Sequence, residues 1–186
     1  AIFLIVFSGC AQKKDIRTAI TDHYSALDSD HYRDGMNLIF GEHYVVVDDT
    51  THALVYNRIN EINASLDVLV LDKELKITHY TSTEYIIGPC FSVNSFTHND
   101  KRVVFGQLSN VMNTHIGDDV SVNLTNIKLV FNDGVSVSQD LASTYGYIIV
   151  ADTIAEISEA NVYEYEKIIS SLADVSNHTC ELQTVT

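Results

Sequence analysis

The chain has 186 residues and a formal net charge of −14, from 25 acidic and 11 basic residues. This length predicts one domain with a sizeable hydrophobic core. The acidic balance, with no basic patch, argues against nucleic acid as a partner and against direct binding to anionic lipid headgroups. The 8 histidines are scattered singly and no Cys/His pair has metal-ligand spacing, so the sequence predicts neither a metal site nor a cofactor.

The N-terminal segment has the pattern of a targeting signal rather than of a folded element. Ile2 to Phe7 form an unbroken apolar run, the small residues Ser8 and Gly9 follow it, and Cys10 begins a polar stretch. Such a run is typical of a secretory signal and is shorter than the roughly 20 apolar residues that cross a bilayer. A cleavable signal with an incidental cysteine, or a buried N-terminal strand, is the alternative interpretation.

The residues Phe7-Ser8-Gly9-Cys10 resemble the bacterial lipobox, with Phe7 in place of the usual Leu. The resemblance implies removal of residues 1–9 as a signal peptide and lipidation of the Cys10 thiol, with residues 10–14 as a tether. Ala11, rather than Asp, follows the cysteine, which implies sorting to the outer membrane of the cell envelope. Several acyl chains together hold a protein on a bilayer where one chain binds only reversibly.

The other cysteines are Cys90 and Cys180. An oxidising compartment permits a disulfide between them, and two buried thiols are the alternative.

Helical spacing dominates the first part of the expected domain. Asp15 to Leu27 predicts an amphipathic helix with Asp15 as its N-cap, and His31 to Phe40 predicts a short second helix. Tyr44 to Asp48 is rich in β-branched residues and predicts a strand, after which Asn57 to Leu69 returns to helical spacing.

The stretch from Leu71 to Val150 predicts β-structure throughout. Its strongest signal is Asn132-Asp133-Gly134, a hairpin turn that follows a mostly alternating strand, and Tyr145 to Val150 predicts a last strand. The tail predicts a C-terminal helix capped by Ser158, with these residues on one face: Val162, Tyr165, Ile169 and Leu172.

Three segments together carry a resemblance to a known family: Ile20 to Asp30, Leu38-Ile39-Phe40 and Tyr44 to Asp48. They resemble the NTF2-like superfamily, which includes SnoaL-type cyclases and ketosteroid isomerases. The resemblance implies an α+β fold over residues 15–175, in which a curved antiparallel sheet forms a cone with N-terminal helices packed on it. The C-terminal helix would be an addition, and residues 176–186 a tail. A β-sandwich or open sheet of another kind is the alternative.

The same resemblance implies a site. Tyr24 would be an oxyanion donor and Asp48 (or Asp49) a base, whereas Glu84 and Asp140 are given no role. Tyr24 as a core aromatic and Asp48 as part of a solvated turn are the alternatives, and the enzyme hypothesis fails if either side chain faces solvent.

The sequence therefore leaves two hypotheses about function. The first is a non-catalytic module that binds a small apolar ligand or a partner protein near the membrane, and the second is an isomerase or cyclase. The tail helix would cover the cone or form a homodimer contact.

Overall fold

The computed structural model describes residues 15–26, 38–58, 64–85, 91–108, 111–113, 119–121, 123–141 and 145–173. Within them, one helix, α1 (Ile16–Ala26), precedes a chain of antiparallel strands. These strands are β1 (Leu38–Val47), β2 (Thr50–Arg58), β3 (Ala64–Leu71), β4 (Ile77–Tyr85), β5 (Asn94–His98), β6 (Lys101–Gln107), β7 (Val111–Asn113), β8 (Asp119–Ser121), β9 (Asn126–Phe131), β10 (Ser136–Asp140), β11 (Gly146–Ala151), β12 (Ile157–Glu164) and β13 (Lys167–Ala173).

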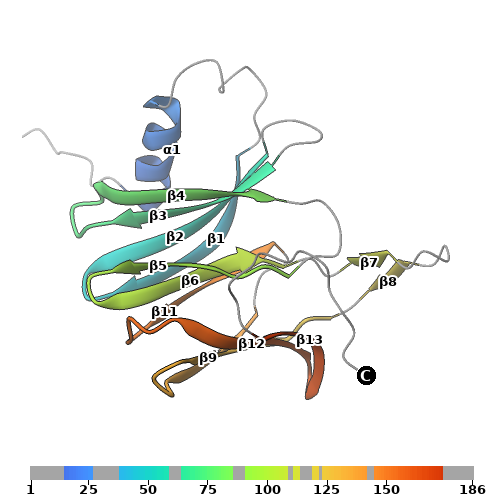
Figure 1. The fold of residues 1–186 in the computed structure, drawn as a ribbon. Helices are drawn as coiled ribbons and strands as arrows, with labels where there is room; N and C mark the ends of the chain where they lie inside the picture. Colours follow the sequence, from blue (N-terminus) through green and yellow to red (C-terminus); the bar gives the residue numbers. More distant parts are fainter. Residues whose placement is uncertain are drawn as a thin grey trace, which may run out of the picture.

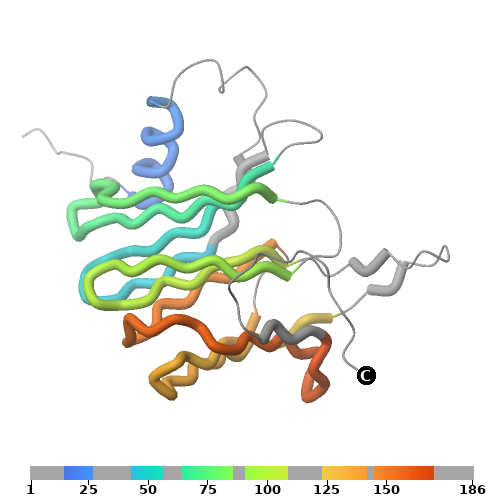
Figure 2. The backbone as a smooth tube through the Cα atoms, viewed as in Figure 1, coloured from blue at the N-terminus to red at the C-terminus, as the bar shows by residue number. Residues whose placement is uncertain are grey.

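The strands form three stacked sheets. We call them the helix-side sheet (order β1-β2-β3-β4), the middle sheet (order β11-β6-β5) and the outer sheet (order β10-β9-β12-β13), and β7 pairs with β8 apart from them. Figure 1 shows α1 lying on the helix-side sheet, with the middle and outer sheets following in turn. The backbone path in Figure 2 shows the same order of layers.

Each gap between layers is filled by its own apolar cluster. Ala19, Ile20 and Tyr24 of α1 pack on β2 and β3, Val103 and Phe105 of β6 pack on the helix-side sheet, and a third cluster joins the middle and outer sheets. All of β3 and most of β6 and β11 are therefore buried on both faces. Strands covered on both faces have near-continuous apolar sequences instead of alternating ones.

Gly146 permits the close approach of the middle sheet to the helix-side sheet. A Cβ atom at this position would lie 2.6 Å from the carbonyl oxygen of Gly106 and 3.3 Å from side-chain atoms of Leu54 and Leu66. A larger residue would clash first with β6 of its own sheet and would also crowd the leucines of the helix-side sheet.

The expected α+β cone is wrong. The described residues are mostly antiparallel sheet, with a single helix on one outer face, so the chain is not an NTF2-like cone with several N-terminal helices. The alternative of a stacked β-architecture agrees with the structure. The physical reason is that the middle sheet needs cover on two faces, which a second and a third sheet provide.

Two expected helices are strands. The stretch from Asn57 to Leu69 contains the end of β2 and most of β3, and the C-terminal helix expected after Ser158 is the hairpin β12–β13. The second short helix, His31 to Phe40, falls largely outside the described residues, and its last part, from Leu38, belongs to β1.

Several local predictions are confirmed. Asp15 caps α1, since its Oδ1 atom accepts a hydrogen bond of 2.6 Å from the Thr18 backbone amide. The expected strand at Tyr44 is part of β1, and the last strand of the β-rich stretch is β11. The turn at Asn132-Asp133-Gly134 joins β9 to β10, with Gly134 at a φ of 86° that suits glycine.

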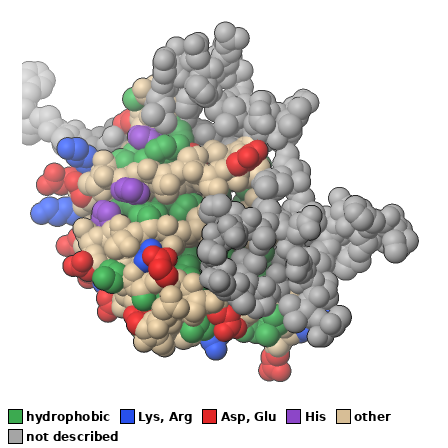
Figure 3. All heavy atoms as spheres, viewed as in Figure 1, with side chains coloured by type: hydrophobic (Ala, Val, Ile, Leu, Met, Phe, Trp, Pro, Cys, Tyr) green, Lys and Arg blue, Asp and Glu red, His purple; other side chains and the backbone are tan. Residues whose placement is uncertain are grey.

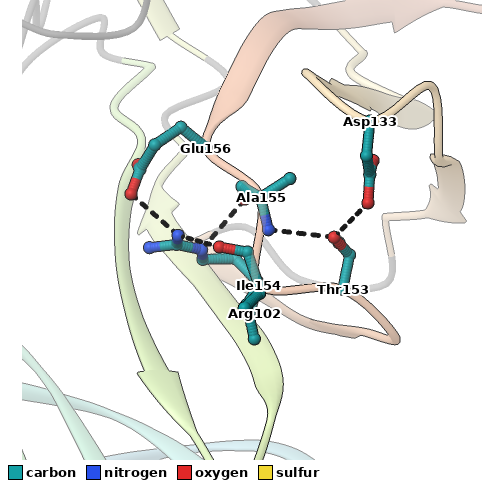
Figure 4. A network of polar contacts seen from close by, with 6 residues as sticks. All are labelled: Arg102, Asp133, Thr153, Ile154, Ala155 and Glu156. Atoms are coloured by element: carbon teal, nitrogen blue, oxygen red, sulfur yellow. Dashed lines mark hydrogen bonds and ion pairs between the residues drawn. The ribbon is translucent and has the colours of Figure 1, made fainter.

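A polar network fixes the loop that crosses from the middle sheet to the outer sheet (Figure 4). The buried guanidinium of Arg102 donates to the carbonyl oxygens of Ile154 and Ala155 and pairs with Glu156 at 2.8 Å. On the other side of the loop, the Thr153 hydroxyl donates to Asp133 at 2.5 Å and accepts from the Ala155 amide. The hydrogen bond that the Thr153 hydroxyl donates to Asp133, together with one from the Val135 amide, lowers the pKa of Asp133. The network joins the middle sheet to the outer sheet and therefore has a structural role.

Candidate functional site

A fully buried carboxylate lies between α1 and the helix-side sheet. Asp67 of β3 is 0% exposed and accepts hydrogen bonds of 2.6 Å from the Tyr24 hydroxyl and 2.6 Å from the Ser82 hydroxyl. The Tyr80 hydroxyl approaches the same carboxylate at 3.5 Å. We call these four residues the Asp67 cluster.

Local structure explains how the cluster assembles. Ile20 and Tyr24 are one turn apart on the buried face of α1, so Tyr24 points down onto the sheet. Asp67 and Ser82 are direct partners in the antiparallel register of β3 and β4, so their side chains lie on the same face. The register and the helix face together bring the hydroxyl groups to the carboxylate.

The hydrogen bonds compensate for burial of the charge. A carboxylate that accepts several hydroxyl donors keeps its charged form at a lower cost than one without partners. Burial raises the pKa of Tyr80, and the Asp67 charge raises it further. Burial lowers the pKa of the neighbouring His23, and the Asp67 charge opposes that shift. Asp67 and Tyr24 are buried, and Ser82 and Tyr80 close the cluster from the exposed side of β4. Because the carboxylate is engaged by neighbouring hydroxyl groups, the cluster suits a structural role.

The expected catalytic pair is not assembled. Tyr24 lies in the Asp67 cluster, whereas the Asp48 side chain is 78% exposed and pairs with Lys101 at 3.3 Å. Asp48 and Asp49 form the turn between β1 and β2, with φ angles of 49° and 61° that are typical of a two-residue hairpin. Because Asp48 faces solvent, the structure does not bring Tyr24 and Asp48 together around one site, as the isomerase or cyclase hypothesis expected.

The structure gives no position for the three cysteines, and it places the two acidic residues without an expected role on exposed strand positions. Cys10, Cys90 and Cys180 lie outside the described residues. Glu84 and Asp140 are exposed on β4 and β10, and Asp140 accepts a hydrogen bond from the Asn126 side chain.

Sequence reasoning missed Asp67. It placed this residue inside an expected helix and gave it no role. The available signal was a single acidic residue within the otherwise apolar run Leu66 to Leu71, because an acid within a buried strand requires hydrogen-bond partners.

A second polar group lies on the opposite face of the same sheet. His52 of β2, His79 of β4 and His98 of β5 meet between the helix-side and middle sheets, and we call them the histidine cluster. The His98 ring centre lies 6.0 Å from that of His52 and 6.3 Å from that of His79. Figure 3 shows histidine side chains, in purple, at the surface of one face of the molecule. Across the described residues, no group of His, Cys, Asp or Glu side chains has an arrangement that could hold a metal ion.

An apolar strip is exposed on β1, the edge strand of the helix-side sheet. Tyr44 is 52% exposed and Val46 is 61% exposed, at alternate positions of the strand. Their register partners on β2, Ala53 and Thr51, are buried. Because register partners share a face, Tyr44 and Val46 lie on the side of the sheet where α1 packs, next to the area that α1 covers. We call these two residues the β1 strip.

The comparisons with known proteins give no relative from which a function could be carried over. No family model matches the chain, and the searches of curated proteins and of solved structures give no match. In the described part of the chain, no helix has the length and the apolar character that a membrane span requires.

Proposed function

We propose that this chain is a lipid-anchored envelope module that binds a partner protein and does no chemistry of its own. The observation that carries the proposal is the β1 strip. Exposed aromatic and aliphatic side chains at alternate positions of an edge strand are a common feature of protein-binding surfaces.

The backbone of β1 supports the same interpretation. In the order of the helix-side sheet, β1 is hydrogen-bonded to β2 and has no other strand beside it among the described residues. An unpaired edge offers backbone donors and acceptors to an extended segment of another chain, and side chains at alternate positions add specificity. The partner would therefore place an extended segment along β1, with apolar side chains over Tyr44 and Val46.

The overall charge of the chain also indicates the kind of partner surface that it would bind. With a net charge of −14, the chain favours a neutral or basic protein surface over an acidic one.

The anchor is a separate part of the proposal and rests on the sequence around Cys10. A lipid on Cys10 would hold the domain at the outer membrane and limit its search for a partner to that surface. Mass spectrometry of the mature N-terminal peptide tests this part. A peptide that begins at an acylated Cys10 supports it, and an unmodified Cys10 or an uncleaved signal contradicts it.

The binding proposal is tested by placing charge on the strip. Tyr44→Glu combined with Val46→Glu should abolish a complex of the full chain that survives mild detergent extraction from its native membrane. Tyr165→Glu is the matched control, because Tyr165 is 73% exposed in the β12–β13 turn, on the outer sheet. The proposal fails if both variants keep the complex or both lose it, or if the complex has twice the mass of the chain and is therefore a homodimer.

A further inference from the structure

The histidine cluster occupies one row of the helix-side sheet and reaches across to the middle sheet. His52 and His79 are both register partners of Val70, so they flank this residue on the same face. His98, at the end of β5, lies next to both rings, and Phe96 of the same strand stacks on His79 with ring centres 4.4 Å apart. The cluster thus joins β2 and β4 of one sheet to β5 of the other.

His52 is placed where a positive charge is unfavourable. It is 2% exposed, and neither of its ring nitrogens makes a hydrogen bond of ordinary geometry. A protonated imidazole has two N–H donors, and leaving donors of a charged group unpaired in the interior costs free energy. Burial lowers the pKa of His52, a contact with the Val45 backbone offsets part of that shift, and His98 lowers the pKa further.

His98 is only partly buried, and its pKa is lowered as well. Burial lowers its pKa, and the nearby ring of His79 lowers it further. A proton on His98 therefore makes a proton on His52 less favourable, as for any two close like charges.

Charged side chains lie around the histidine cluster at this end of the helix-side and middle sheets. They lie in the turns β1–β2, β3–β4 and β5–β6, at the start of β6 and after β11: Asp48, Asp49, Asp72, Lys73, Glu74, Lys76, Asp100, Lys101 and Asp152. Lys101 adds a positive charge beside His98, its register partner on β6. The carboxylates of Asp48 and Asp152 lie 3.3 and 3.1 Å from the Lys101 ammonium group and are engaged by it.

We propose that the histidine cluster is an acid-sensitive latch, which holds β4 against β5 when His52 and His98 are neutral and releases this edge of the two sheets when they are protonated. Both β4 and β5 are edge strands of their sheets, so they can separate without breaking the central strand pairs. None of the three histidines belongs to the β1 strip.

The direction of the pH dependence follows from the lowered pKa values. A histidine with a folded-state pKa below the ordinary value of 6.5 contributes its full stability above about pH 6.5, and this contribution is lost as the pH falls through the range below that value. Mildly acidic conditions should therefore open the latch, and neutral conditions should close it.

Hydrogen exchange of the full chain tests the proposal. Exchange is followed at about pH 7.5 and about pH 5.5, with times scaled for the intrinsic pH dependence of amide exchange. Acid should reduce the protection of β4 and β5 by roughly tenfold more than that of the β9–β12 pair in the outer sheet. His98→Gln, which removes the central imidazole, should abolish most of this difference.

His23→Gln is the matched control, since His23 lies on the opposite side of the sheet and also has a lowered pKa. It should leave the response of β5 unchanged, and β5 is the strand read in this control because the His23 ring also contacts Tyr80 of β4. If His98→Gln does not fold, His79→Gln takes its place, because its side chain is only partly buried. Equal loss of protection in β9–β12, or a full response in the His98→Gln chain, would overturn the proposal.

Discussion

Asp67 and His52 lie on opposite faces of the helix-side sheet, and both are almost completely buried. Asp67 accepts hydrogen bonds from Tyr24 and Ser82, whereas neither ring nitrogen of His52 has an ordinary partner. The first group can keep a charge in the interior, and the second is stable there as a neutral ring. The same sheet thus has one face with a hydrogen-bonded carboxylate and, by our proposal, one face that responds to protons.

The largest effect should follow removal of the carboxylate. Asp67→Ala removes the carboxylate that accepts from the Tyr24 and Ser82 hydroxyls and opens a void beneath α1, so we expect a loss of about 3 kcal/mol in the free energy of unfolding. Denaturant unfolding at neutral pH measures it. Glu84→Ala, at an exposed position of β4, is the control and should change stability by less than about 0.5 kcal/mol. A small effect for Asp67→Ala would show that the cluster does not hold the helix on the sheet.

A smaller loss should follow removal of one donor. Tyr24→Phe keeps the ring in the core and deletes the hydroxyl that donates to Asp67, so we expect a loss of about 1–2 kcal/mol. The same unfolding experiment detects it. If Tyr24→Phe were as harmful as Asp67→Ala, the carboxylate would depend on this single donor rather than on the cluster.

The smallest change in the free energy of unfolding at neutral pH is expected for His52, on the face of the helix-side sheet that packs on the middle sheet. His52→Leu removes ring nitrogens that have no ordinary partner, so stability at about pH 7.5 should change by less than about 1 kcal/mol. At about pH 5.5 the variant should be more stable than the natural chain, because leucine has no proton to take up while the lowered pKa of His52 costs the natural chain stability there. Unfolding curves at the two pH values give both numbers. A variant that stays less stable than the natural chain in acid would contradict the contrast between the two faces.

Local signals predicted local structure well. Asp15 as an N-cap, the Asn132-Asp133-Gly134 turn and the apolar strand β11 depend on neighbouring residues alone, and the structure confirms them. The stacking of three sheets depends on which strand faces which, and a single sequence does not specify it.

The two wrong helices have a physical explanation. Every residue of β3 is buried, so its sequence lacks the alternation that marks a strand, and Leu66 and Leu69 match helical spacing by chance. In the tail, a register shift between Val162 and Tyr163 and a turn at Tyr165 with a φ of 55° change which positions face the core. The resulting apolar spacing imitates a helix.

The residues of the Asp67 cluster were predicted only in part. Tyr24 was singled out, but its partner Asp67 comes from a strand that is far from it in the sequence and that was expected to be helical. The β1 strip could not be predicted, because Tyr44 and Val46 look like ordinary strand residues until the area covered by α1 is known.

Site-specific photo-cross-linking on the β1 strip tests the central functional claim most directly. A photoreactive amino acid at position 44, in the full chain in its native membrane, should form an adduct with one partner protein, and the same group at position 165 should not. An adduct at both positions, at neither, or only with a second copy of this chain would contradict the account.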